Sequence, residues 1–173
     1  MKELIQQTAL RTLELEAQSI YGLRSSINDQ FVKAVEAISN AKGRVVMSGI
    51  GKSAVIAQKI VATFNSTGTP SLFMHAADAI HGDLGMIQQD DVVIILSKSG
   101  ESPEIRALVQ LIRNFGNTII AMVGNIHSSL AQQASLILDT TVEQEACPNN
   151  LAPTSSTTAQ LVMGDALAIC LME

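Results

Sequence analysis

The spacing of hydrophobic residues changes along the chain at about residue 40. Before that point apolar side chains recur at intervals of three and four residues, as on one face of a helix: Leu10, Leu13, Ala17, Ile20, Leu23, Ile27 and Phe31. This spacing predicts helix over about residues 2–40, with Ser25-Ser26 as the place for a break. We therefore expect an N-terminal helical segment at 1–40, packed on a domain at 41–173.

After residue 40, short apolar runs rich in β-branched residues alternate with helical patterns. The runs lie at 44–48, 71–75, 92–97, 118–123 and 136–140, and the helical segments between and after them at about 52–66, 103–116, 128–134 and 154–172. This alternation predicts an α/β domain, in which a doubly wound, Rossmann-like, five-stranded parallel sheet is flanked by helices. Ligands of such sheets bind at the carboxyl ends of the strands, so the residues after each run are the candidates for a site.

Composition narrows the class of protein and its partners. Apolar residues make up 47% of the 173 residues and charged residues 16%, as expected where helices cover both faces of a parallel sheet. The net charge of −5 argues against nucleic acid as a partner. No apolar run approaches the roughly 20 residues that span a bilayer, so no membrane partner is expected. Cys147 and Cys170 are expected to be reduced thiols, and reduced thiols are typical of cytoplasmic proteins.

The low charge fraction and the amphipathic helix also favour a homo-oligomer, a dimer or a tetramer. The alternative is that the helix covers only the sheet of its own chain.

The stretch "VVMSGIGKSAVI" at 45–56 has the strand, glycine turn, lysine and serine of a nucleotide-binding P-loop. That motif requires a glycine at position 46, where this chain has Val46, so the turn is too short to wrap a chain of phosphates. A helix N-terminus with Lys52 and Ser53 suits one phosphate monoester instead. Lys52 is expected to balance phosphate or enolate charge, and the alternative is a solvated surface lysine.

The segment "SKSGESPE" at 97–104 contains the most informative cluster of polar residues. Ser97, Ser99 and Ser102 supply three hydroxyls, Gly100 permits a tight turn, and the next proline suits the first position of a helix. We expect this segment to bind the phosphate of a small metabolite. An ordinary helix N-cap with a solvated turn remains the alternative.

Two glutamates are candidates for moving a proton between neighbouring carbon atoms of a phosphosugar. Glu104 lies in the first turn of a predicted helix, so the alternative to a catalytic role is that its charge only complements the helix dipole. Glu145 lies on a loop that follows a strand. His75 and His81 are six residues apart and have no obvious third ligand, so the pattern gives little support to a metal site. His81 is instead expected to lie near a sugar hydroxyl.

Four segments together resemble the arabinose-5-phosphate isomerase family, which has the architecture of the SIS (sugar isomerase) domain. They are "GxGKS" at 49–53, "FxSTGTPSxFxHxxxAxHGDLGM" at 64–86, "SxSGES.E" at 97–104 and "EACPxxLAPTSSTTAxLVMGDALA" at 145–168. The resemblance implies an intramolecular aldose–ketose isomerase that interconverts D-arabinose 5-phosphate and D-ribulose 5-phosphate through a cis-enediolate. It also implies supply of the octulosonate sugar (Kdo) of bacterial lipopolysaccharide or capsule, and a tetrameric assembly.

The resemblance assigns roles residue by residue. It implies catalytic roles for Lys52, Glu104, Glu145 and His81, with His81 in contact with substrate, and substrate-binding roles for Ser53, Gly68, Thr69, Ser97, Ser99 and Ser102. It implies no required cofactor, and it aligns His75 with a histidine that binds zinc in relatives, where the metal is expected to inhibit.

Two departures from the family pattern bear on function. Relatives continue past "GDALA" into an H-P-G-G segment and usually a pair of CBS domains, whereas this sequence ends at Glu173; Lys98 stands where relatives often have Asn. The alternatives are therefore a phosphosugar-binding module without catalysis, or an isomerase of another ketose phosphate.

Overall fold

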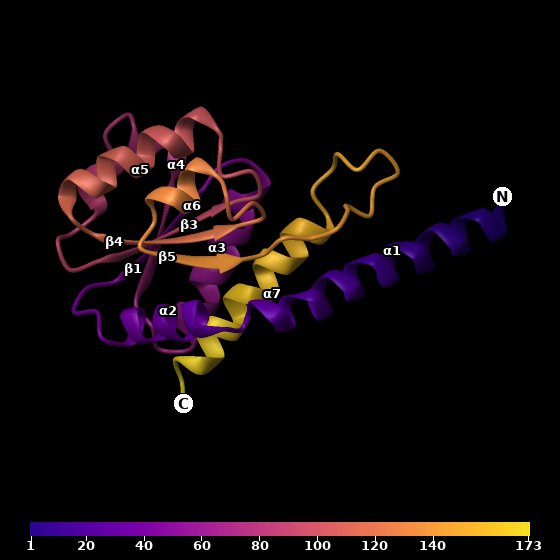
Figure 1. Cartoon of the computed structure of the whole chain (residues 1–173), viewed down its shortest axis with the longest axis horizontal. Helices are drawn as coiled ribbons and strands as arrows, with labels where there is room; N and C mark the ends of the chain where they lie inside the picture. The colour runs from indigo at the N-terminus through magenta and orange to yellow at the C-terminus, as the bar shows by residue number, and fades with distance from the viewer.

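The computed structural model describes residues 1–173 and contains one five-stranded parallel sheet (Figure 1). The strand order is β2-β1-β3-β4-β5, with β1 (Val45–Gly49), β2 (Ser71–His75), β3 (Val92–Ser97), β4 (Thr118–Val123) and β5 (Leu136–Asp139). Each strand lies on one of the apolar runs, so the predicted α/β fold class and parallel sheet are confirmed.

The central strands send alternate side chains into two separate hydrophobic cores. In β3, Val92, Ile94 and Leu96 enter one core, while Val93 and Ile95 enter the other, as the two-residue period of a strand requires. The sheet is therefore buried on both faces, which explains why its strands are continuous apolar runs without alternating polar residues.

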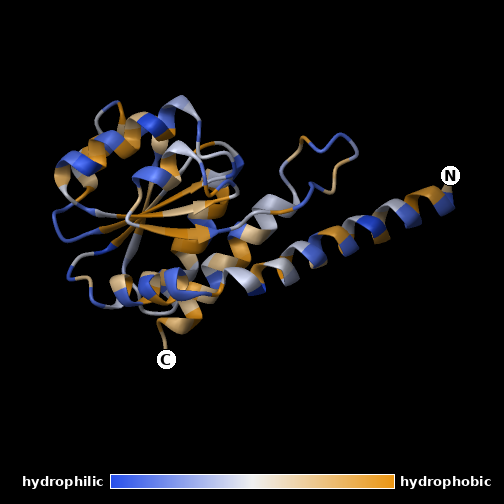
Figure 2. Cartoon of the chain, in the orientation of Figure 1, coloured by the Kyte–Doolittle hydropathy of each residue, from blue (hydrophilic) through white to orange (hydrophobic).

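Three helices cover each face of the sheet (Figure 1). One core is closed by α2 (Asp29–Ser39), α3 (Lys52–Ser66) and α7 (Ser155–Cys170), and the other by α4 (Ala76–Ala79), α5 (Pro103–Phe115) and α6 (Ser129–Gln133). Figure 2 shows the hydrophobic residues concentrated in the strands and on the inner sides of these helices.

The N-terminal segment consists of α1 (Lys2–Gly22), the 3₁₀ helix η1 (Leu23–Ser26) and α2. The 3₁₀ turn lies where the sequence indicated a break. Whereas α2 packs into the core, no residue of α1 is buried, and its amino-terminal part projects away from the body (Figure 1). In the structure α2 packs on the sheet, and the carboxyl-terminal part of α1 lies along α7.

The connection after β2 contains two short elements that the sequence pattern did not predict. They are α4 and the 3₁₀ helix η2 (Asp83–Met86), and each spans four residues. One turn of helix is too short to display a hydrophobic period, so periodicity could not detect either element.

The strand order places the expected ligand position between β1 and β3. These two strands are neighbours, and the chain leaves β1 toward β2 on one side and β3 toward β4 on the other. The loops after β1 and β3 therefore diverge and leave a crevice at the carboxyl edge of the sheet, which is where doubly wound proteins bind ligands. None of the helices combines the length and the apolar character that crossing a membrane requires.

Candidate active site

A cavity of about 310 Å³ lies at this crevice and gathers polar residues from three segments. The turn after β1, the loop after β3 and the start of α7 supply its lining: Ile50, Lys52, Ser53, Ser97, Lys98, Ser99, Ser102, Pro153, Ser156 and Thr157. Eight of these ten residues carry a hydroxyl or an ammonium group. The cavity is at the small end of the range for ligand pockets, which suits a small polar metabolite.

The loop between β3 and α5 brings its three serines to this cavity. The Ser97 hydroxyl accepts a hydrogen bond from the Gly100 N–H at 3.0 Å, and the Ser99 hydroxyl accepts one from the Glu101 N–H at 3.2 Å. Each hydroxyl keeps its own hydrogen for donation to a ligand. The Ser102 hydroxyl is buried without a partner, although Ser102 is the N-cap of α5. The capping alternative therefore does not account for this serine.

The path of the same loop depends on Gly100 and Glu101. Gly100 has a φ of +66°, and a Cβ atom there would overlap the Ser128 side chain, so only glycine fits. The Glu101 carboxylate accepts a hydrogen bond from the Ser129 N–H at 2.7 Å and pairs with Arg106. Glu101 thus ties the loop to α6 and is directed away from the cavity lining.

Lys52 and Ser53 reach the cavity from the first turn of α3. The turn before them requires Gly51, whose φ is +59°. Lys52 is exposed and forms no ion pair within the chain, which leaves its ammonium group available to a ligand. The free N–H groups at the start of α3 add positive potential on the same side of the cavity.

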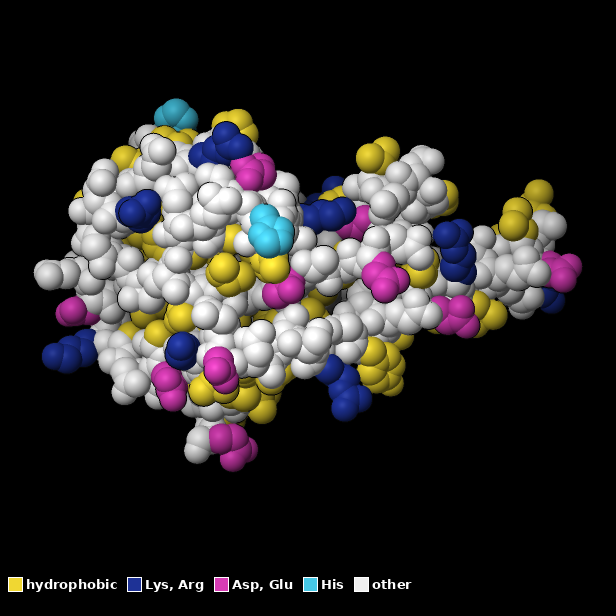
Figure 3. All heavy atoms as spheres, in the orientation of Figure 1, with side chains coloured by type: hydrophobic (Ala, Val, Ile, Leu, Met, Phe, Trp, Pro, Cys, Tyr) yellow, Lys and Arg dark blue, Asp and Glu magenta, His cyan; other side chains and the backbone are white.

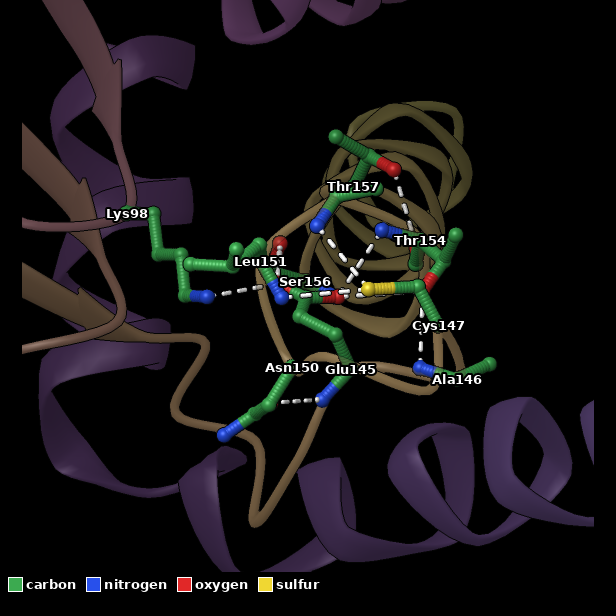
Figure 4. Close-up of polar contacts among 10 residues, drawn as sticks. Lys98, Glu145, Ala146, Cys147, Asn150, Leu151, Thr154, Ser156 and Thr157 are labelled. Atoms are coloured by element: carbon green, nitrogen blue, oxygen red, sulfur yellow. Dashed lines mark hydrogen bonds and ion pairs between the residues drawn. The ribbon is translucent and has the colours of Figure 1, made fainter.

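Glu145 lies just behind the cavity lining, in contact with the lining residues Lys98 and Ser156, and its carboxylate is fully buried. Figure 4 shows the polar contacts of this carboxylate. Oε2 accepts hydrogen bonds from the Thr154 N–H at 2.8 Å, the Thr154 hydroxyl at 3.2 Å and the Ser156 N–H at 3.2 Å. Oε1 accepts one from the Ser156 hydroxyl at 2.5 Å and pairs with the Lys98 ammonium at 2.7 Å. The carboxylate therefore occupies the positive end of α7.

These contacts determine the ionisation of Glu145. Burial by itself would raise the pKa of this carboxyl group, but the Lys98 ammonium and the donors at Ser156 and Thr154 lower the pKa to about 2. In this arrangement Glu145 is an ionised and only weakly basic carboxylate.

The other predicted catalytic residues lie outside the cavity lining. Glu104 is half-buried in the first turn of α5, and its side chain makes no hydrogen bond or ion pair. His81 is exposed between α4 and η2. The structure thus places Lys52 on the cavity and Glu145 behind it, and it places neither Glu104 nor His81 there.

His75 ends β2, and its Nδ1 atom is 4.0 Å from the Asp78 carboxylate. No group of three or more His, Cys, Asp or Glu residues is arranged to hold a metal ion. One imidazole with one neighbouring carboxylate is short of the three protein ligands usual at a zinc site, so zinc binding at His75 stays a prediction.

Gly68 and Thr69 precede β2 and lie at the amino edge of the sheet, in a hollow with Ser39, Gly43 and Leu171. The cavity with Ser97 lies at the carboxyl edge. The five residues of β2 separate the two edges by about 16 Å at the usual rise of a strand. Within one chain Gly68 and Thr69 therefore do not reach a ligand in that cavity, and such a contact would require a second copy of the chain.

Five of the ten lining residues were not among the predicted site residues, and three of these five are polar: Lys98, Ser156 and Thr157. Ser156 and Thr157 belong to the hydroxyl-rich start of α7, inside the family motif at 145–168, and Lys98 is the departure from the family pattern after β3. Their position at a helix start and a strand end was the available signal.

Comparison with known proteins identifies the family. The model of the SIS domain matches residues 37–170, and the chain belongs to the SIS-domain family. The arabinose 5-phosphate isomerase KdsD of Pseudomonas aeruginosa is 55% identical over 166 residues, which is 96% of this chain and 51% of that protein. The arabinose 5-phosphate isomerase GutQ of Salmonella typhimurium is 44% identical over 173 residues, which is all of this chain and 54% of that protein.

Two solved structures have the same fold over nearly the whole chain. The c3406 protein of E. coli CFT073 in complex with arabinose 5-phosphate has a TM-score of 0.94 and 40% sequence identity, and the match covers 99% of this chain and 90% of that one. A putative sugar-phosphate isomerase of Listeria monocytogenes has a TM-score of 0.95 and 34% identity, with 99% and 91% coverage. The chain spans about half the length of the curated relatives it matches.

Proposed function

We propose that this chain is an aldose–ketose isomerase that interconverts D-arabinose 5-phosphate and D-ribulose 5-phosphate. The observation that carries the proposal is the cavity at the carboxyl ends of β1 and β3, where serine hydroxyls and Lys52 line a small polar space directly in front of a buried carboxylate. The names of the curated relatives and the arabinose 5-phosphate complex of the E. coli protein support this choice of substrate.

The proposed reaction moves one proton between neighbouring carbon atoms. The hydroxyls of Ser53, Ser97, Ser99 and Ser102 hold the phosphate, so that binding energy remote from the reacting carbons orients them. A carboxylate removes the proton from C2 of the aldose, and the resulting cis-enediolate is reprotonated at C1, while a hydroxyl proton passes from O2 to O1. The ketose results with no net change in atoms or electrons.

Lys52 stabilises the oxygen that gains negative charge in the enediolate, because its ammonium group has no partner in the chain. Glu145 and Glu104 both remain candidates for the base, and the position of Glu145 behind the cavity favours it. In the resting arrangement its contacts make it a weak base, so at least one of them must be released for efficient proton abstraction.

We propose that the reaction uses no metal or organic cofactor, since a base and a cation suffice for this proton transfer. We propose further that the chain works in the cytoplasm as a homodimer or homotetramer, supplying the five-carbon phosphosugar from which Kdo is built. The exposed apolar residues on α1, which nothing in the chain covers, support an assembly of copies.

A panel of substrates tests the proposed activity. Purified protein is expected to convert arabinose 5-phosphate and ribulose 5-phosphate and to leave hexulose and heptose phosphates unchanged. Glu104→Gln and Glu145→Gln variants then identify the base, because only the variant that lacks it should lose turnover while still binding arabinose 5-phosphate. Wild-type turnover in both variants would exclude both glutamates as the base.

The second candidate function is a phosphosugar-binding module without catalysis. The complete set of hydrogen bonds to Glu145, which is typical of a structural carboxylate, favours this alternative. It predicts saturable binding of arabinose 5-phosphate in a calorimeter and no turnover of any phosphosugar in the panel.

A further inference from the structure

Lys98 is the one residue outside the segment 144–157 that forms a hydrogen bond or ion pair with the Glu145 side chain (Figure 4). The other donors to this carboxylate, at Thr154 and Ser156, belong to the start of α7 and are fixed by that helix. Lys98 reaches Glu145 from the loop after β3. The ion pair is therefore the link between the serine-lined loop and the buried carboxylate.

The backbone of Lys98 is fixed, whereas its side chain is partly exposed. Its backbone carbonyl accepts a hydrogen bond from the Gly124 N–H at 3.1 Å, which fixes the residue at the end of β3. The side chain itself is 46% exposed and lines the cavity. A lysine stem with this much exposure can turn its ammonium group toward the cavity without moving the backbone.

A phosphate in the cavity would compete with Glu145 for this ammonium group. Lys98 is flanked by Ser97 and Ser99, so a phosphate held by their hydroxyls lies beside the lysine. A phosphate monoester carries nearly two negative charges at neutral pH and presents three acceptor oxygens, whereas the carboxylate carries one charge and retains four other donors when Lys98 leaves. The exchange therefore leaves neither anion without partners.

We propose that Lys98 is a positioning residue that couples occupation of the phosphate site to the state of Glu145. In the empty site Lys98 holds the Glu145 carboxylate as an inert ion pair; a bound phosphoryl group draws the ammonium group away and leaves the carboxylate more basic. This inference rests on the proposed isomerase function for its consequence in catalysis, but the exchange itself depends only on phosphate binding.

The coupling is tested directly with inorganic phosphate. Protein labelled with ¹³C at the glutamate carboxyl carbons gives a Glu145 signal that is assigned by its loss in Glu145→Gln. Phosphate is expected to shift this signal in the wild-type protein and to raise the measured pKa of the carboxyl group. In Lys98→Met the signal should start at a different position and respond at least tenfold less to saturating phosphate.

Lys59→Met is the matched control. Lys59 also pairs with a carboxylate, at 2.6 Å from Asp165, and it does not line the cavity. The phosphate response of Glu145 should be unchanged in this variant. An unshifted Glu145 signal in wild-type protein that binds phosphate, or an equal shift in Lys98→Met, overturns the proposal.

Steady-state kinetics provide a second measurement. Lys98→Met is expected to raise KM for arabinose 5-phosphate about tenfold or more, because a charge-assisted contact to phosphate is lost. The kcat of Lys98→Met should change less than about threefold, because in the wild-type complex the Lys98 ammonium group has already left Glu145. Lys98→Arg should restore the wild-type KM. A loss of kcat at unchanged KM in Lys98→Met overturns the proposal. Absence of turnover in the wild-type protein refutes the isomerase function instead, and the phosphate titration then decides whether Lys98 has the proposed role.

Discussion

The buried carboxylate of Glu145 shows how strongly one residue depends on its neighbours. Four hydrogen bonds and the Lys98 ammonium group keep it ionised although it is shielded from water. Because all of these partners favour the ionised form, the folded state is stabilised while the carboxylate is charged. Protonation of the carboxylate therefore lowers the stability of the fold.

Acid should therefore destabilise the protein through Glu145. Its pKa is about 2 when folded and 4.5 when unfolded, so the stabilisation is fully present above about pH 5 and is lost as the pH falls toward 2. The difference corresponds to about 3 kcal/mol. Urea unfolding at pH 7 and pH 3 should show about 2 kcal/mol of this loss, because the folded carboxyl group is still mostly ionised at pH 3. Glu145→Gln should show a smaller pH dependence than the wild-type protein. An equal loss in both proteins would assign the effect to other carboxylates.

Lys52 should matter for catalysis far more than for stability, because it is exposed and forms no ion pair. Lys52→Met is expected to lower kcat by about 100-fold or more, as removal of a group that stabilises an oxyanion does, with little change in the urea midpoint. Lys59→Met, in the same helix but outside the cavity, is the control and should keep wild-type kcat. Near-normal turnover in Lys52→Met would contradict the assigned role.

At the scale of elements, the packing of α3 against α7 determines where Lys52 and Glu145 lie relative to each other. Lys52 begins α3, and the N-terminus of α7 surrounds Glu145. The two helices approach closely at Gly164, where a Cβ atom would overlap side-chain atoms of the fully buried Ile60. The small residue therefore sets the distance between the helices.

Gly164→Ala should destabilise the protein by about 1–3 kcal/mol, despite the better helix propensity of alanine, because Ile60 has no space to move into. Thermal unfolding measures the change. Gly22→Ala is the matched control, since a Cβ atom at Gly22, the last residue of α1, meets nothing within 4 Å, and it should be neutral or slightly stabilising. If the two variants had equal stability, the close contact would not limit the packing.

At the scale of the whole molecule, the apolar faces of the sheet are covered, whereas part of the apolar surface of α1 is not. The sheet has both faces covered, whereas α1 projects with apolar side chains in contact with solvent (Figure 3). Leu10, Leu13, Ala17 and Tyr21 lie on the side of α1 opposite to the residues that contact α7, and Leu10 and Leu13 are 62% and 68% exposed. A helix with one covered and one uncovered apolar side is typical of an interface between subunits.

Leu13→Glu should therefore weaken self-association. The wild-type protein is expected to sediment as a dimer or tetramer, and the variant to shift toward monomer, because a carboxylate replaces an apolar contact in the interface. Gln7→Glu adds the same charge to the same helix at a polar position and should keep the wild-type mass. A wild-type protein that is monomeric at all concentrations would exclude the proposed assembly.

Much of the fold could be predicted from local sequence. The strands are apolar runs bounded by polar turns, and the 3₁₀ turn at Leu23–Ser26 falls at the serines that interrupt the first helix. The grouping of Ser97, Ser99 and Ser102 with Lys52 could also be predicted, because parallel strands direct the loops that follow them to one edge of the sheet.

The local sequence by itself thus determined the five strands, the longer helices, the parallel direction of the strands and the edge of the sheet that carries the serine hydroxyls, because these depend on residues close together in the chain. Only the tertiary structure decided that Lys98 pairs with Glu145, that Glu104 and His81 lie outside the cavity, and that α1 extends from the body. These features depend on which side chains from distant segments meet in space, and no spacing along the chain encodes the distance between an ammonium group on one loop and a carboxylate on another.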